Sequence, residues 1–85
     1  MTTNLENKTV EVTIASELGY ELIARACAAS FARMIGFSAE RIEDIKTVVA
    51  EAAINAMQHG NMGRQDARVN ISMVFKSDIL HIAVM

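Results

Sequence analysis

The spacing of apolar residues along this chain changes from two residues to three or four and then back to two, which limits the possible folds. Apolar and polar residues alternate over residues 9–15, so we predict a half-buried strand there. Helical spacing over residues 16–35 and 38–59 predicts two helices, and alternation over 67–75 and 79–85 predicts a hairpin. This order favours an α+β fold, a two-layer sandwich with both helices on one face of a mixed or antiparallel sheet.

Each predicted helix starts at a serine with a glutamate one or two residues later, Ser16 before the first and Ser38 before the second. Serine is a preferred N-cap residue, and a glycine follows each helix as a stop signal. For the first helix we expect the large apolar residues to face the core: Leu18, Leu22, Ile23, Ala26, Cys27, Phe31 and Met34. Its opposite face is expected to be exposed: Glu21, Arg25, Ala28 and Ala32. The buried stripe of the second is expected to be Ile42, Ile45, Val49, Ala52, Ala53 and Ala56.

Length and charge exclude several classes of protein. A chain of 85 residues forms one small domain, which buries only about 60–65% of the surface that it exposes when unfolded. Eight basic and 10 acidic residues give a net charge of -2, which argues against direct contact with nucleic acid. Cys27 is the single cysteine, so an intramolecular disulfide is excluded. The hydrophobic fraction of 52% predicts a folded chain rather than a disordered one.

The N-terminal residues give a first indication of location. The first ten residues have no apolar core of the kind that a secretory signal needs, and residues 1–8 are polar and expected to be frayed. No apolar stretch is long enough to span a bilayer. We therefore expect a cytoplasmic protein without a membrane partner.

Three polar residues share one side of the second predicted helix. Glu51, Asn55 and His59 are spaced by four residues, and each such step moves only about 40° around a regular α-helix. Mg²⁺ prefers oxygen ligands and is commonly shared between one or two protein oxygens and substrate phosphates. Asn55 offers a neutral oxygen ligand, Glu51 offers a base for an attacking hydroxyl, and His59 offers a hydrogen bond to a phosphate. An ordinary solvated helix face, with His59 favoured by the helix dipole, is the alternative explanation of the same spacing.

The stretch IEDIKTVVAEAAINAMQHG, residues 42–60, resembles the N box of the GHKL (Bergerat-fold) ATPase and kinase superfamily. It is most similar to the anti-sigma-factor serine protein kinase branch. The resemblance extends upstream through the first strand and helix and downstream into the hairpin, from about residue 10 to residue 85. It implies a domain that binds ATP and Mg²⁺, with Glu51 as general base, Asn55 as Mg²⁺ ligand and His59 beside the nucleotide.

The same resemblance implies partners. Members of this branch act as anti-sigma factors that bind a sigma factor, and they phosphorylate a small anti-anti-sigma protein on serine. They are expected to form homodimers. In that branch the first helix contacts the partner proteins, and Glu21 and Arg25 occupy the matching positions. A surface ion pair between these two residues, which lie four apart, is the alternative explanation.

The next motif of the family, Asp-x-Gly-x-Gly, does not occur in residues 1–85. The family uses its aspartate to bind adenine, and the lid that follows is also missing. We therefore expect residues 1–85 to be a partial domain that ends after the hairpin. The leading hypothesis is an anti-sigma factor with ATP-dependent serine kinase activity. The alternatives are a non-catalytic sigma-binding module and a truncated paralogue.

Overall fold

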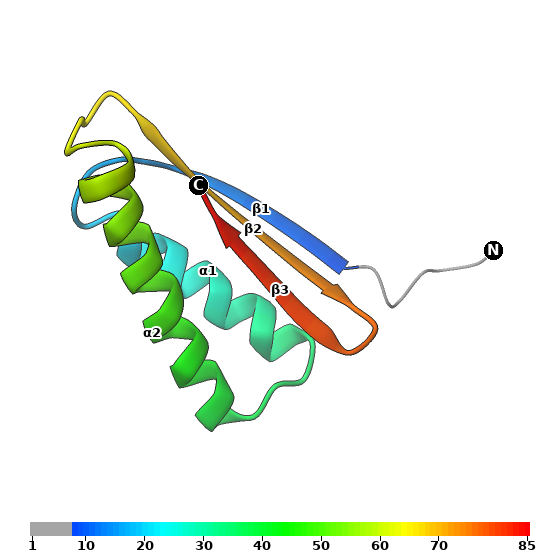
Figure 1. Cartoon of the computed structure of the whole chain (residues 1–85). Coiled ribbons are helices and arrows are strands. Elements are labelled where there is room, and N and C mark those ends of the chain that lie inside the picture. Colours follow the sequence, from blue (N-terminus) through cyan, green and yellow to red (C-terminus); the bar gives the residue numbers. More distant parts are fainter. Residues whose placement is uncertain (1–7) are drawn as a thin grey trace.

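The computed structural model describes residues 8–85 and confirms the predicted two-layer α+β sandwich. Its elements are β1 (Lys8–Ala15), α1 (Glu21–Met34), α2 (Ala39–Asn55), the π-helical turn η1 (Ala56–Gly60), β2 (Arg68–Lys76) and β3 (Ile79–Val84). Both helices lie on the same face of the sheet (Figure 1). The expected fraying of the first residues lies outside the described part of the chain, except that Lys8 is paired with Phe75 in the sheet.

The sheet is antiparallel throughout, with β2 between β1 and β3. The register places Ile71 of β2 opposite Val12 of β1 and Val84 of β3. Side chains that lie opposite one another in an antiparallel sheet point to the same face. The apolar positions of all three strands therefore form one continuous surface beneath the helices.

A tight turn joins β2 to β3 and completes the predicted hairpin. Its two central residues, Ser77 and Asp78, have φ angles of 54° and 64°. Two consecutive positive φ angles are the mark of a type I′ turn, whose twist matches that of the two strands it connects. This turn fixes the hairpin register.

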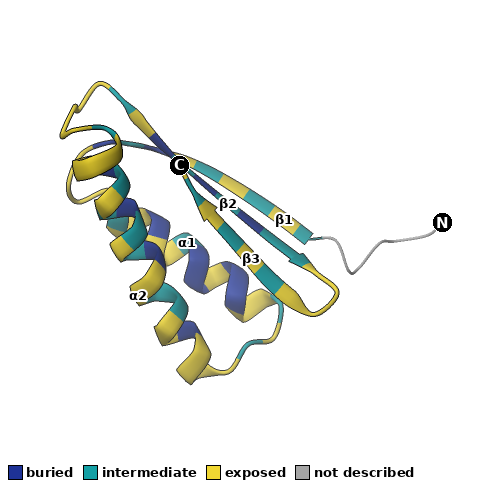
Figure 2. Cartoon of the chain, in the orientation of Figure 1, coloured by how far each residue is buried: buried dark blue, intermediate teal, exposed yellow. Residues whose placement is uncertain are grey.

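The core lies between β2 and the two helices (Figure 2). Val69, Ile71 and Met73 on β2 are completely buried. The buried residues packed around them come from every layer: Ile14, Ala24, Ala28, Phe31, Val49 and Met57. One core therefore holds the sheet and both helices together.

The predicted start of the first helix is wrong. The helix begins at Glu21, five residues after Ser16, and its N-cap residue Tyr20 forms no capping hydrogen bond through its side chain. Ser16 is instead buried at the end of β1, where its hydroxyl accepts a hydrogen bond from the side chain of Asn61 at 3.0 Å. A serine before an apolar run can be an N-cap residue, or it can be buried with its hydroxyl in a hydrogen bond. Only tertiary contacts distinguish the two.

The predicted buried face of the first helix is also largely wrong. The large residues Leu22, Ile23 and Met34 are 49%, 50% and 63% exposed, whereas Ala28 and Ala32 are completely buried. Of the expected core residues, Phe31 is buried and Cys27 is half-buried, while Leu18 and Ala26 are exposed. Small side chains let α1 approach the sheet and α2 closely, which explains why the alanine face points inward.

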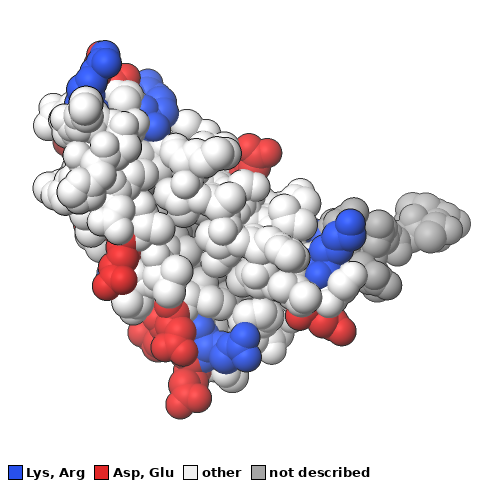
Figure 3. All heavy atoms as spheres, viewed as in Figure 1, with Lys and Arg blue, Asp and Glu red and all other residues white. Residues whose placement is uncertain are grey.

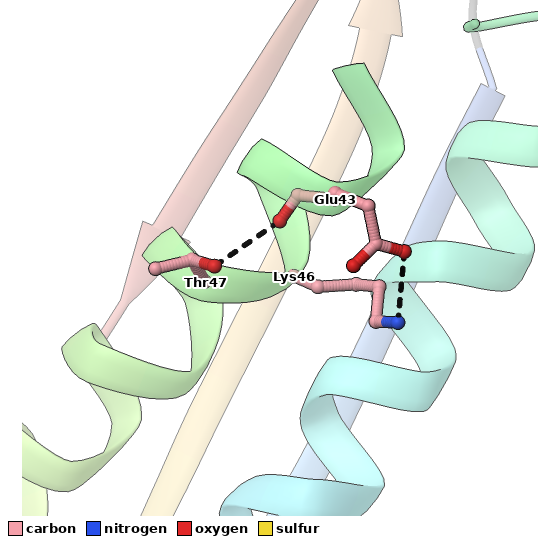
Figure 4. A network of polar contacts seen from close by, with 3 residues as sticks. All are labelled: Glu43, Lys46 and Thr47. Carbon is pink, nitrogen blue, oxygen red and sulfur yellow. Dashed lines mark hydrogen bonds and ion pairs between the residues drawn. The ribbon is translucent and has the colours of Figure 1, made fainter. Parts of the chain in front are cut away.

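The second helix agrees better with the prediction. Ser38 is its N-cap, and the serine hydroxyl accepts a hydrogen bond from the backbone N–H of Arg41 at 3.2 Å. Three residues of the expected stripe are buried, and three are half-buried: Ile42, Val49 and Ala53, then Ile45, Ala52 and Ala56. On another part of this helix, Glu43 binds Lys46 and Thr47 (Figure 4), with a 3.1 Å contact between the Lys46 ammonium and the Glu43 carboxylate.

Charged side chains are unevenly distributed over the surface. Figure 3 shows them mainly towards the ends of the face in view, with a broad middle region free of Lys, Arg, Asp and Glu. Among the described residues, neither helix combines the length and the hydropathy that a membrane crossing requires.

Candidate functional site

Glu51 and Asn55 lie on the side of α2 that points away from the core. Each is two residues from the fully buried Ala53, which places it about 200° around the helix from that residue. Both side chains are exposed, as is His59 one turn later in η1. The structure thus brings the three predicted residues to the accessible surface of α2 and of η1, which follows it directly.

The step from Asn55 to His59 differs from the regular spacing that we expected. After Asn55 the helix widens into the π turn η1, in which the backbone N–H of Asn61 donates to the carbonyl of Ala56 at 2.8 Å. A π turn closes its hydrogen bond over five residues rather than four, so it changes the angular position of every residue within it. Single π turns in helices occur frequently at functional sites.

Glu51, Asn55 and His59 suit a metal ion that is shared with a bound phosphate better than a metal ion that is enclosed by protein ligands. No side-chain hydrogen bond or ion pair between described residues involves Glu51, Asn55 or His59. Within residues 8–85, no three His, Cys, Asp or Glu side chains come together in a metal-binding group. An exposed carboxylate and an exposed amide fit a Mg²⁺ ion that keeps most of its ligands as waters and phosphate oxygens.

A polar cavity and an apolar cavity lie next to the helices. The polar one, of about 400 Å³, lies beside η1, between the β1–α1 connection and the loop that leads to β2. Its lining consists of Ser16, Glu17, Leu18, Met57, Gln58, Gly63 and Gln65. The apolar one, of about 370 Å³, lies between β1 and α1 and includes Cys27. Neither is lined by Glu51, Asn55 or His59, so the candidate site is an open surface rather than a pocket.

Glu21 and Arg25 do not form the surface ion pair that was the alternative prediction. The Glu21 carboxylate accepts a hydrogen bond from the backbone N–H of Gly19 at 2.6 Å. The ion pairs found among the described residues are Lys46–Glu43 and Arg64–Asp66. Arg25 is exposed on α1, so its guanidinium is available to a partner.

Sequence reasoning missed Asn61, which connects the end of the candidate site to the sheet. Its side-chain amide donates to the Ser16 hydroxyl at 3.0 Å and to the Arg68 carbonyl at 3.2 Å. The available signal was local, because asparagine directly after a helix-ending glycine is typical of a helix C-terminus. That signal indicates a cap but gives no information about a partner 45 residues away.

Comparison with known proteins identifies the family. The family described as "Histidine kinase-like ATPase domain" matches residues 9–85, nearly the whole chain. The chain belongs to this family. The GHKL resemblance of the N-box stretch is therefore confirmed, and the helix that carries Glu51 and Asn55 is part of a histidine kinase-like ATPase fold.

The relatives point to one branch of the family. The chain is 33% identical to a serine-protein kinase RsbW of Oceanobacillus iheyensis over 76 residues, which are 89% of this chain and 47% of that protein. It is 31% identical to an anti-sigma F factor of Clostridium beijerinckii over 80 residues, 94% of this chain and 55% of that protein. The chain is also 33% identical to an anti-sigma F factor of Geobacillus stearothermophilus over 64 residues, which are 75% of this chain and 44% of that protein. The chain thus spans about half the length of these relatives.

Proposed function

We propose that this chain carries the N box of an ATP-dependent serine protein kinase that also acts as an anti-sigma factor. The observation that carries the proposal is the exposed pair Glu51 and Asn55 on a helix that matches the histidine kinase-like ATPase family. Relatives named serine-protein kinase and anti-sigma F factor support the two activities. The substrate is a small anti-anti-sigma protein, and the protein acts in the cytoplasm.

Asn55 would hold Mg²⁺ through its side-chain oxygen, and His59, in η1, would donate a hydrogen bond to a phosphate of the nucleotide. Bound Mg·ATP would supply the γ-phosphoryl group, which would pass to the serine oxygen of the substrate as ADP leaves. Glu51 accepts the proton of the serine hydroxyl of the substrate, so that the oxygen becomes a better nucleophile. All three side chains are exposed and therefore need no rearrangement of the core to reach a bound nucleotide.

A non-catalytic module that sequesters a sigma factor is the second candidate function. It is favoured by the surface of α1, where Leu22 and Ile23 are about half exposed beside the exposed Arg25. Arginine is enriched among the residues that dominate protein–protein interfaces, and the buried centre of an interface is more apolar than its rim. A homodimer is also expected, and both β1 and β3 are edge strands with one unpaired side within the described sheet.

Titration of the 85-residue chain with Mg·ATP, followed by NMR, tests the nucleotide site. We expect the signals of Glu51, Asn55 and His59 to move, with a dissociation constant of about 1 mM or weaker, about 4 kcal/mol of binding free energy. Affinity is expected to be low because phosphate and metal contacts at an open surface are screened by solvent and salt. ATP with EDTA is the control, and a shift that does not depend on Mg²⁺ would contradict the assignment of Asn55.

A further inference from the structure

Asn61, the residue that follows η1, forms hydrogen bonds through both its backbone and its side chain. The Asn61 backbone N–H closes the π turn on Ala56 at 2.8 Å, and the Asn61 carbonyl accepts from the backbone N–H of Arg64 at 2.9 Å. Its side-chain amide reaches the Ser16 hydroxyl at 3.0 Å and the Arg68 carbonyl at 3.2 Å. One asparagine therefore joins the end of the helix to the ends of β1 and β2.

The partner of this asparagine is firmly held. Ser16 is 3% exposed and is the buried polar residue of the described chain. Its backbone N–H donates to the Ala67 carbonyl at 3.1 Å, directly before β2. In Figure 1 the connection after β1 and the loop before β2 lie side by side next to η1. The hydrogen bond from Asn61 thus ties the π turn to the sheet.

These contacts select one of two ways to end the helix. Continued α-helix geometry would use the Ala56 carbonyl for the N–H of Gly60, whereas the π turn uses it for the N–H of Asn61. His59 lies inside this turn, while Asn55 lies in regular helix before it. The direction of the His59 side chain relative to Asn55 therefore depends on which hydrogen bond forms.

We infer that Asn61 is a positioning residue for the phosphate end of the nucleotide site, held in place by the buried hydroxyl of Ser16. The inference rests on the proposed function for the identity of the ligand. Asn61 fixes the π turn, the π turn orients His59, and His59 would donate a hydrogen bond to a phosphate of the nucleotide whose Mg²⁺ Asn55 would hold. Residues that orient the ligands of a metal ion are commonly almost as important for binding as the ligands themselves.

The test compares Asn61→Ala, Asn61→Asp and Ser16→Ala with the wild-type chain, using NMR and the Mg·ATP titration described above. Asn61→Asp keeps the shape of the side chain and removes both amide donors, so it separates hydrogen bonding from packing. Asn70→Ala is the matched control, because Asn70 is a half-buried asparagine whose amide lies 3.5 Å from Glu11, away from η1. Ser16→Ala removes one of the two side-chain bonds and is the milder variant if the others unfold.

We expect the amide hydrogen of Asn61 to exchange about tenfold faster in Asn61→Asp and Ser16→Ala, with no change at Ile71 in the central strand. Mg·ATP should bind about tenfold more weakly to the Asn61 variants and equally well to Asn70→Ala. Equal affinities for the wild type, both Asn61 variants and Ser16→Ala would overturn the positioning role. So would exchange that accelerates evenly across the sheet, because that result indicates a general loss of stability. If the Asn55 and His59 signals of the wild-type chain do not shift with Mg·ATP, the proposed function and this inference are both overturned. If the wild type binds Mg·ATP and the variants bind it equally well, only this inference is overturned, so the two failures are distinguishable.

Discussion

The carboxylate of Glu21 accepts a hydrogen bond from the backbone N–H of Gly19 at 2.6 Å. Gly19 has a φ of 109°, a conformation that residues with a side chain rarely adopt, so the glycine makes this approach possible. Glu21 therefore stabilises the entry into α1. Its neighbour one turn later, Arg25, is exposed on the same helix.

Arg25→Glu is expected to weaken sigma-factor binding by about tenfold or more, because the reversal removes an attraction and adds repulsion at an interface. Mg·ATP affinity should stay the same, since Arg25 lies on α1 and the candidate site lies on α2 and η1. A pull-down titration against a sigma factor measures the effect. Arg33→Glu is the matched control, because Arg33 is an exposed arginine in the last turn of the same helix. Equal binding by wild type and Arg25→Glu would remove Arg25 from the interface.

Substitutions at Glu51 and Asn55 should have separate effects. Glu51→Gln keeps the size of the side chain and removes the base, so we expect nucleotide affinity to persist while phosphoryl transfer falls by about 10²–10⁴-fold. Asn55→Ala removes an oxygen ligand and should weaken Mg·ATP binding itself. Nucleotide titration and phosphorylation of an anti-anti-sigma protein measure the two effects in any form of the protein with detectable kinase activity. Glu40→Gln, at an exposed acid early in the same helix, is the control; full activity in Glu51→Gln would exclude Glu51 as the base.

Ala28→Leu and Leu22→Ala test which face of α1 is buried. Ala28 is completely buried, so three extra carbons should overpack the core and reduce the free energy of unfolding by about 1–3 kcal/mol. Leu22 is 49% exposed, and its truncation should change stability by no more than about 0.5 kcal/mol. Urea denaturation of both variants measures the difference. The opposite order of effects would show that the large apolar residues face the core after all.

Ser38→Ala should reduce the free energy of unfolding by about 1 kcal/mol, because the backbone N–H of Arg41 loses its capping acceptor. For a domain of this size that loss corresponds to a fall in Tm of about 4–8 °C. Ser30→Ala is the matched control, since Ser30 is exposed within α1 and alanine has the higher helix propensity. A Tm for Ser38→Ala equal to that of Ser30→Ala would show that the cap contributes nothing to stability.

Local sequence patterns determined the order of elements, the antiparallel hairpin and the helix that carries the candidate site. Alternating residues define which side of a strand is apolar, so the alternation alone assigns Val69, Ile71 and Met73 to one face, and all three are buried. Ser38 could be recognised as a cap because its acceptor and donor are only three residues apart. The shared helix face of Glu51 and Asn55 could also be recognised from local sequence, because it follows from the helical repeat alone.

Tertiary packing decided the rest. Both faces of α1 carry residues with apolar character at helical spacing, and the alanine face points inward because it allows the closest approach to the sheet and to α2. The function of Ser16 depends on Asn61, 45 residues later in the chain, and no local pattern encodes a hydrogen bond between them. The π turn that contains His59 is closed by the backbone N–H of the same asparagine. Periodicity reports which residues share a side, whereas the side that becomes buried, and the partner that a polar group meets, depend on how the layers fit together.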